Sequence, residues 1–198
     1  MTRSSLLPHC ALAVLLMPAL AFAAPTVNTL GGDTRVVLSP ELVGALTSLN
    51  VAVAPTYPAK LKRGEARFPI PAGELDLGTL KGEVAHNGGL SLRAGGTTVD
   101  LSSYVIDTTS ATPVLTGLVK VNDSVIGRVP LFDLSLPSAP VVRGLHSRAG
   151  SLQLDDVQLT LTDEAAAALN AVFAVTAFAE GIPIGTARVS TYFYEPSP

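Results

Sequence analysis

The chain has 198 residues and carries 13 Lys and Arg against 16 Asp and Glu, a formal net charge of −3 at neutral pH. This balance argues against nucleic acid as a partner, because binding to phosphate groups depends on clustered basic side chains. The one basic cluster, KLKRGEAR at residues 60–67, is interpreted as a solvated loop.

Residues 1–23 have the layout of a secretory signal peptide. Arg3 precedes an apolar run, and Ala21 and Ala23 form an A-x-A cleavage site. The run is shorter than the roughly 20 apolar residues of a membrane span, so no transmembrane segment is expected. The single cysteine lies in this leader, so disulfides are not expected to stabilise the exported chain. Residues 24–198 are predicted to form one β-rich domain, secreted or periplasmic.

Strand-length segments separated by Gly, Pro, Asn and Asp dominate this domain. They are TRVVLSP, GEVAH, GLSLRA, TTVDLSSYVID, VLTGLVKV, SVIGRVPLFDLSL, SLQLDDVQLTL and GTARVSTYFY. In the fourth, Val99, Leu101 and Val105 share one face by the two-residue period, which places Tyr104 on the opposite, less buried face. Such alternation indicates sheets with one buried side, and we predict a mainly β fold, an antiparallel β-sandwich with two short helices.

The two helices are predicted near residues 40–49 and 163–172. Ser39 and Thr162 are the expected N-caps, and each is followed by an acidic residue and then by apolar residues at helical spacing. When the two caps are aligned, residues 34–55 and 157–178 match in strand, cap, glutamate and leucine positions. We interpret this match as an internal duplication.

Two irregular segments are predicted near the carboxyl-terminal half. The apolar phase of LQLDDVQLTL shifts at Asp155 and Asp156, which indicates a β-bulge more than a calcium site. Residues 135–151, SLPSAPVVRGLHSRAGS, are predicted to form a long exposed loop in which His146 is solvated.

His86 is the principal candidate for a functional side chain. It precedes Asn-Gly-Gly and shares a strand face with Leu90 and Leu92, so its ring is expected to point toward the packed side. In one interpretation the ring is satisfied by local hydrogen bonds and Gly88-Gly89 serves a backbone conformation that a side chain would forbid. In the other, His86 lies at an apolar cleft and orients a ligand or a tyrosine that binds it.

Tyrosines are the other candidates. Tyr192 and Tyr194 share the outward face of the last strand, Tyr104 is placed on an outer face, and Tyr57 precedes Pro58 in a turn. Exposed tyrosines on a sheet are ordinary cross-strand partners and sometimes form a binding platform.

Four segments of the chain together resemble the haem-transport-associated (HtaA-type) domain: HNGGLSL, VDLSSYVID, VPLFDLSL and LTLTDEAAAALNAVF. The resemblance implies a β-rich domain with helices at its ends, in which a tyrosinate binds haem and a histidine supports the tyrosine. His86 occupies the histidine position, with Ala85 where the family has glycine. The segment that carries the family's tyrosine corresponds to residues 39–50, SPELVGALTSLN, which contain no aromatic residue.

Two functions remain open. The sequence contains no G-x-S-x-G or H-E-x-x-H motif, and we predict neither an enzyme nor a metal site. The favoured hypothesis is a secreted, non-catalytic envelope or extracellular protein. The alternative is a module that binds haem or another flat apolar ligand through His86 and a nearby tyrosine, with Tyr104, Tyr192 and Tyr194 as candidates. Under either hypothesis the expected partner is a small apolar ligand or an envelope component, and haem is a possible but not favoured cofactor.

Overall fold

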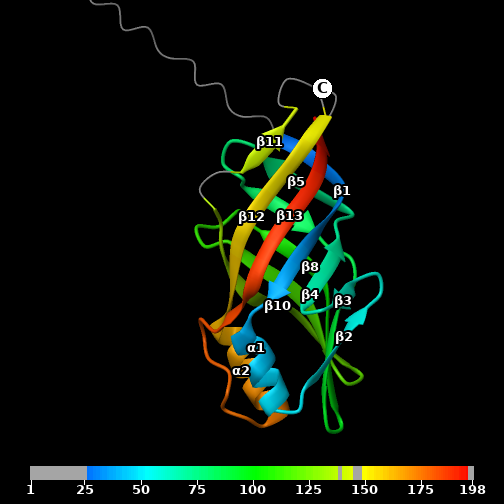
Figure 1. Ribbon diagram of the computed structural model, residues 1–198, viewed down its shortest axis with the longest axis vertical. Coiled ribbons are helices and arrows are strands. Elements are labelled where there is room, and N and C mark those ends of the chain that lie inside the picture. The colour runs from blue at the N-terminus through cyan, green and yellow to red at the C-terminus, as the bar shows by residue number, and fades with distance from the viewer. Residues whose placement is uncertain (1–25, 138–139, 145–148, 196–198) are drawn as a thin grey trace, which may run out of the picture.

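The computed structural model describes residues 26–137, 140–144 and 149–195 (Figure 1). The leader and His146 lie outside these residues. The helices are α1 (Pro40–Ser48) and α2 (Asp163–Phe173). The strands are β1 (Thr26–Leu38), β2 (Ala52–Thr56), β3 (Lys60–Lys62), β4 (Glu65–Pro69), β5 (Ala72–Asp76), β6 (Gly82–Ala85), β7 (Gly89–Ala94), β8 (Thr97–Asp107), β9 (Val114–Val121), β10 (Ser124–Ser135), β11 (Val141–Arg143), β12 (Ala149–Leu161) and β13 (Pro183–Tyr194).

The strands form a closed antiparallel β-barrel. Eight of them pair in the circular order β1-β13-β12-β10-β9-β8-β6-β5 and back to β1, and each of these ladders is antiparallel. The mainly β, antiparallel prediction is confirmed, but the predicted sandwich is wrong. Alternation along a strand identifies one buried face, and it does not distinguish a second packed sheet from the same sheet curved back on itself.

At one end of the barrel the ring of paired strands is complete (the closed end). At the other end it is interrupted (the divided end). β4 and β5 pair with successive halves of β1, and β6 and β7 pair with successive halves of β8. At one end β5 pairs with β6 and completes the barrel. At the other end β4 pairs with β3 and β7 pairs with β2, and no ladder joins these two strand pairs within the described residues. Residues 86–88, which connect β6 to β7, lie where the two strand pairs separate.

Both helices lie at the divided end of the barrel (Figure 1). Ser39 caps α1 by accepting a hydrogen bond from the Leu42 amide, and Thr162 caps α2 by accepting one from the Ala165 amide. Each cap hydroxyl also bonds a neighbouring strand: Ser39 donates to the Pro183 carbonyl, and Thr162 donates to main-chain carbonyls of β10. The predicted helices and their caps are confirmed.

The bulge predicted at Asp155 and Asp156 is also confirmed. The register between β12 and β13 shifts between Leu154 and Val157, and Asp156 has a positive φ of 58°. The Asp155 carboxylate accepts hydrogen bonds from the side chains of Gln153 and Arg188, which holds its pKa below the usual value.

Two loop predictions need correction. The basic cluster at residues 60–67 is not a loop: it forms the β3–β4 hairpin, and Arg67 on β4 pairs with Asp33 on β1. The segment 135–151 is not a continuous loop either, since it contains β11, which pairs with β12. β3 and β11 are strands of three residues, too short to show a two-residue alternation.

The two proposed repeats share their first half. In each, a long strand beside β13 leads through a hydroxyl cap into a helix. After α1 the chain forms β2, whereas residues 174–182 after α2 contain no strand. The internal duplication of residues 34–55 and 157–178 stays a hypothesis.

Candidate functional site

An apolar cavity of about 270 Å³ occupies the barrel interior at the helix end. Side chains from α1, α2 and the strands around the divided end line it, and none of these residues is Lys, Arg, Asp or Glu. The lining reaches the surface at exposed residues of α2, Ala168 and Ala171, and at Ile126 beyond the β9–β10 turn, which is 60% exposed. The mouth of the cavity therefore lies between α2 and the β9–β10 hairpin.

The other end of the cavity is deep in the barrel. Ile106, Leu134, Val157 and Val189 border both this cavity and a smaller one, of about 20 Å³, toward the closed end. These four side chains form the floor of the larger cavity. Its polar lining residues are Thr34, His86 and Tyr104, and they lie at or near the point where the barrel divides.

His86 is buried, with 4% of its surface exposed, and lines the cavity. Its main-chain amide donates to the Tyr104 carbonyl, and its ring Nε2 lies 2.7 Å from the Thr34 hydroxyl oxygen on β1. Burial lowers the pKa of His86 to about 4, although the nearby carbonyls of Tyr104 and Val84 act in the opposite direction. The ring is therefore neutral at physiological pH, and the inward orientation predicted from the sequence is confirmed.

Ring atom Nδ1 of His86 is buried without a hydrogen-bond partner among the described residues. The main-chain carbonyls of Tyr104 and Val84 lie near enough to the ring to act on its pKa. A buried polar atom without a partner costs about 1–3 kcal/mol, and in native proteins such atoms call for an explanation, for example a missing ligand or water. Of the two ring nitrogens of His86, Nε2 therefore has a hydrogen-bond partner and Nδ1 has none among the described residues.

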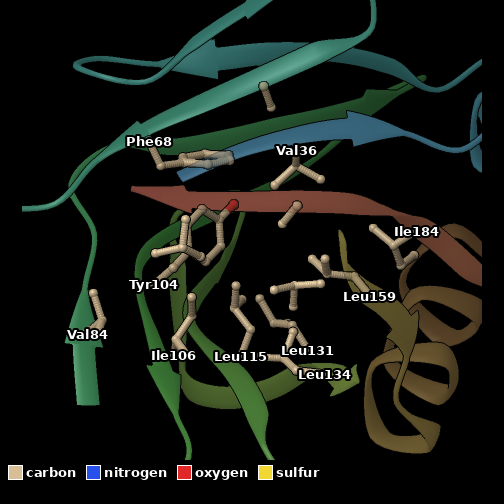
Figure 2. Packing of buried hydrophobic residues seen from close by; sticks show 14 of the residues in the cluster. Val36, Phe68, Val84, Tyr104, Ile106, Leu115, Leu131, Leu134, Leu159 and Ile184 are labelled. Atoms are coloured by element: carbon tan, nitrogen blue, oxygen red, sulfur yellow. The ribbon is translucent and has the colours of Figure 1, made fainter. Parts of the chain in front are cut away.

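Tyr104 is buried, which corrects the sequence-based placement of this residue on an outer face. Its exposed fraction is 4%, and Figure 2 shows its ring beside Phe68, with centroids 5.2 Å apart and planes at 84°. The register between β8 and β9 shifts between Ser102 and Val105, and Ser103 has a positive φ of 50°. This bulge reverses the alternation, so Tyr104 and Ile106 point inward. In the sequence Tyr104, Val105 and Ile106 are consecutive apolar residues, so they do not show which of the two phases is buried.

The remaining tyrosines lie away from the cavity. Tyr192 and Tyr194 are 65% and 44% exposed on the outer face of β13, as predicted, and Tyr57 is 92% exposed in a turn. None of the three lines the cavity. Of the candidate site residues, the structure therefore brings together His86 and Tyr104.

Several cavity residues were not recognised from the sequence. Thr34 is buried on β1, where its neighbours Val36 and Leu38 also line the cavity. The two-residue period through TRVVL contains this signal, but a threonine at an inward position is ordinary in strands. The alanines of α2 were not singled out in the sequence, because their small size gives no signal for a cavity mouth.

The lining does not fit a haem held by a tyrosinate. The only lining side chains of a type that ligates haem iron are His86 and Tyr104. The Tyr104 hydroxyl donates to the Leu101 carbonyl at 3.1 Å, and burial raises the pKa of this tyrosine, which disfavours its anion. No cationic side chain in the lining could pair with the two carboxylates of haem.

Within residues 26–137, 140–144 and 149–195, no three His, Cys, Asp or Glu side chains cluster in a way that could hold a metal ion. Neither helix in this part of the chain is long and apolar enough to cross a membrane.

Solved structures with this architecture come from Corynebacterium glutamicum. The C-terminal domain of HtaA superposes with a TM-score of 0.62 at 13% identity, covering 84% of this chain and 99% of that domain. The heme binding protein HtaB gives a TM-score of 0.55 at 13% identity, covering 85% and 94%. The N-terminal domain of HtaA gives 0.54 at 12% identity, covering 88% and 99%. No protein-family model and no curated protein matches the sequence. The chain has an HtaA-type fold.

Proposed function

We propose that this protein is a secreted or periplasmic, non-catalytic module that binds a small apolar molecule inside the barrel. The cavity is the observation that carries this proposal. It has about 270 Å³ of space and an almost wholly apolar lining that reaches the surface beside α2. Ligand sites in proteins are mostly apolar clefts with a few polar groups, and apolar cavities of about 150 Å³ already bind small aromatic molecules.

The structure offers little support for catalysis at this site. General acid–base chemistry at neutral pH favours groups whose pKa lies near the operating pH. Burial moves the pKa of His86 down to about 4 and moves that of Tyr104 up, so each group is held in its neutral form. The export of the protein is proposed from the signal-peptide pattern of residues 1–23.

The first test blocks the mouth of the cavity. Ala168→Phe places a ring at an exposed lining position, and we expect the affinity for the fluorescent apolar probe N-phenyl-1-naphthylamine to fall about tenfold, a loss of ~1.4 kcal/mol. Ala167→Phe is the matched control, because Ala167 is exposed on the same helix and does not line the cavity. Equal affinities of the two variants would contradict the proposal. Near-ultraviolet circular dichroism checks that both variants keep native packing.

Haem is the second candidate ligand, and the observations in its favour are the HtaA-type fold and the buried His86 beside Tyr104. We expect haemin to produce no Soret shift that depends on Tyr104, because the hydroxyl is held neutral and bonded to a main-chain carbonyl. The measurement is an absorption titration of the unmodified protein and of Tyr104→Phe. A Soret shift that the variant loses would favour haem over other apolar ligands.

A further inference from the structure

The wall of the cavity offers a ligand almost no polar surface. Its polar lining residues are Thr34, His86 and Tyr104. The Thr34 hydroxyl and the Nε2 atom of His86 bond to each other at 2.7 Å, and the Nδ1 atom of His86 is buried. The Tyr104 hydroxyl donates to the Leu101 carbonyl. A polar group on the part of a ligand that enters the barrel therefore loses its hydration without a compensating hydrogen bond.

The cavity extends along the strands. Its lining follows β1 from Leu38, close to the helices, to Thr34, and β9 from Val121, beside the β9–β10 turn, to Leu115, which is paired with the floor residue Ile106. At about 3.3 Å per residue these stretches are roughly 13 and 20 Å long. A volume of about 270 Å³ spread over this length suits a single chain better than a broad ring system. By the scale of a cavity of about 150 Å³ that holds benzene, it has room for roughly ten carbon atoms.

The mouth leaves one end of such a chain in water. Ala168 and Ala171 of α2 and Ile126 of the β9–β10 hairpin border it, and their side chains carry neither a charge nor a hydrogen-bonding group. Val125, next to Ile126 at the tip of the hairpin, is 67% exposed, so the rim of the mouth is apolar as well. A chain that enters with its apolar end first keeps a polar end group hydrated outside the barrel.

We propose that the ligand is a single-chain amphiphile, a molecule with one unbranched hydrocarbon chain of roughly ten carbons and one polar end group. The chain fills the barrel with its methyl end toward the floor, and the polar group stays in water between α2 and the β9–β10 hairpin. The inference rests on the proposed function and adds the chemical class of the ligand and its orientation.

The first experiment compares decanoate, 1-decanol and decanedioate as competitors of N-phenyl-1-naphthylamine at neutral pH, below their micelle and solubility limits. Decanoate and 1-decanol differ in the charge of an end group that stays hydrated, so we expect their affinities to agree within about tenfold. Decanedioate carries a second carboxylate at the far end of the same chain. Because one carboxylate must then be buried among apolar side chains, we expect it to bind at least ~100-fold more weakly than decanoate.

The second experiment tests the orientation with a charge at the mouth. Ala168→Lys places an ammonium group at an exposed lining position, and we expect the affinity for decanoate to rise about threefold relative to that for 1-decanol. Ala167→Lys is the matched control, because Ala167 is exposed on the same helix and does not line the cavity. We expect a smaller change in the control.

The outcomes separate the two proposals. If the dye binds but decanoate does not displace it, or decanedioate displaces it as well as decanoate does, the amphiphile inference is overturned and the apolar site stands. A ratio of decanoate to 1-decanol affinity that changes equally in the two lysine variants, or in neither, also overturns the inference. If the dye does not bind the unmodified protein, the apolar site and the inference both fail. Weak binding of decanedioate, together with a gain for decanoate that is larger in Ala168→Lys, supports the inference.

Discussion

Replacing Gly89 with Val is expected to lower the free energy of unfolding by at least ~3 kcal/mol. Gly89 is buried at the start of β7, opposite Ser102 of β8. A Cβ at this position would overlap the carbonyl oxygen of Leu101 and crowd the Cα of Ser102. Both obstacles are main-chain atoms that cannot rotate away, so the β7–β8 ladder must separate to admit the side chain.

The neighbouring Gly88 explains why the chain uses a glycine pair here. Its φ is +86°, a conformation that L side chains rarely adopt, as the sequence predicted for at least one of the two residues. Gly96→Val is the matched control, because a Cβ at Gly96 in the β7–β8 turn meets no atom within 4 Å. We expect this control to cost less than ~1 kcal/mol in urea unfolding. A Gly89→Val variant as stable as the control would show that β7 is not packed as described.

The second large effect is a loss of stability in mild acid. The folded protein keeps His86 neutral down to a pKa of about 4, whereas the ring of an unfolded chain takes up a proton near its ordinary value of 6.5. Between these values the unfolded state binds more protons, so the free energy of unfolding decreases as the pH falls from about 6.5 to about 4. The shift corresponds to about 3 kcal/mol, fully present above pH 6.5 and lost by pH 4.

His86→Gln isolates this contribution. Glutamine does not titrate, so the variant is expected to lose about 3 kcal/mol less than the unmodified protein between pH 7 and pH 4, as measured by urea unfolding at each pH. Asp33 also affects the acid limb, because its hydrogen bonds and ion pairs with Arg35 and Arg67 outweigh burial and lower its pKa below 3.8. The variant shares this effect, which cancels in the comparison. Parallel pH profiles for the two proteins would contradict the assignment of a buried neutral histidine.

Local features of the fold were predictable because each depends on neighbouring residues. A hydroxyl residue before an amphipathic run indicates a helix start, and both Ser39 and Thr162 form N-caps. A change of apolar phase indicates a bulge, and the one at Asp155 and Asp156 is present. Each of the eight strand-length segments chosen from the sequence lies within or largely overlaps a strand of the structure. The inward orientation of His86 follows from the same period.

The site itself depended on the tertiary structure. Alternation does not specify closure, so the sequence alone supported a sandwich where the strands form a barrel. The bulge at Ser103 turns Tyr104 inward, and the consecutive apolar residues Tyr104, Val105 and Ile106 do not show this shift unambiguously. The partner of His86, Thr34, is 52 residues away in the sequence, and no local rule links the two.

The sequence by itself determined a β-rich chain with two capped helices, and an inward-facing histidine that precedes a glycine pair. These features follow from short-range periodicity and local hydrogen bonding. The sequence also indicated an amino-terminal segment with the pattern of a signal peptide. The tertiary structure decided that the barrel divides beside this histidine, that one ring nitrogen has no partner there, and that an apolar cavity opens beneath the helices. The physical reason is that strand pairing, unlike strand formation, is set by contacts between distant segments, and a cavity is the space that those contacts leave unfilled.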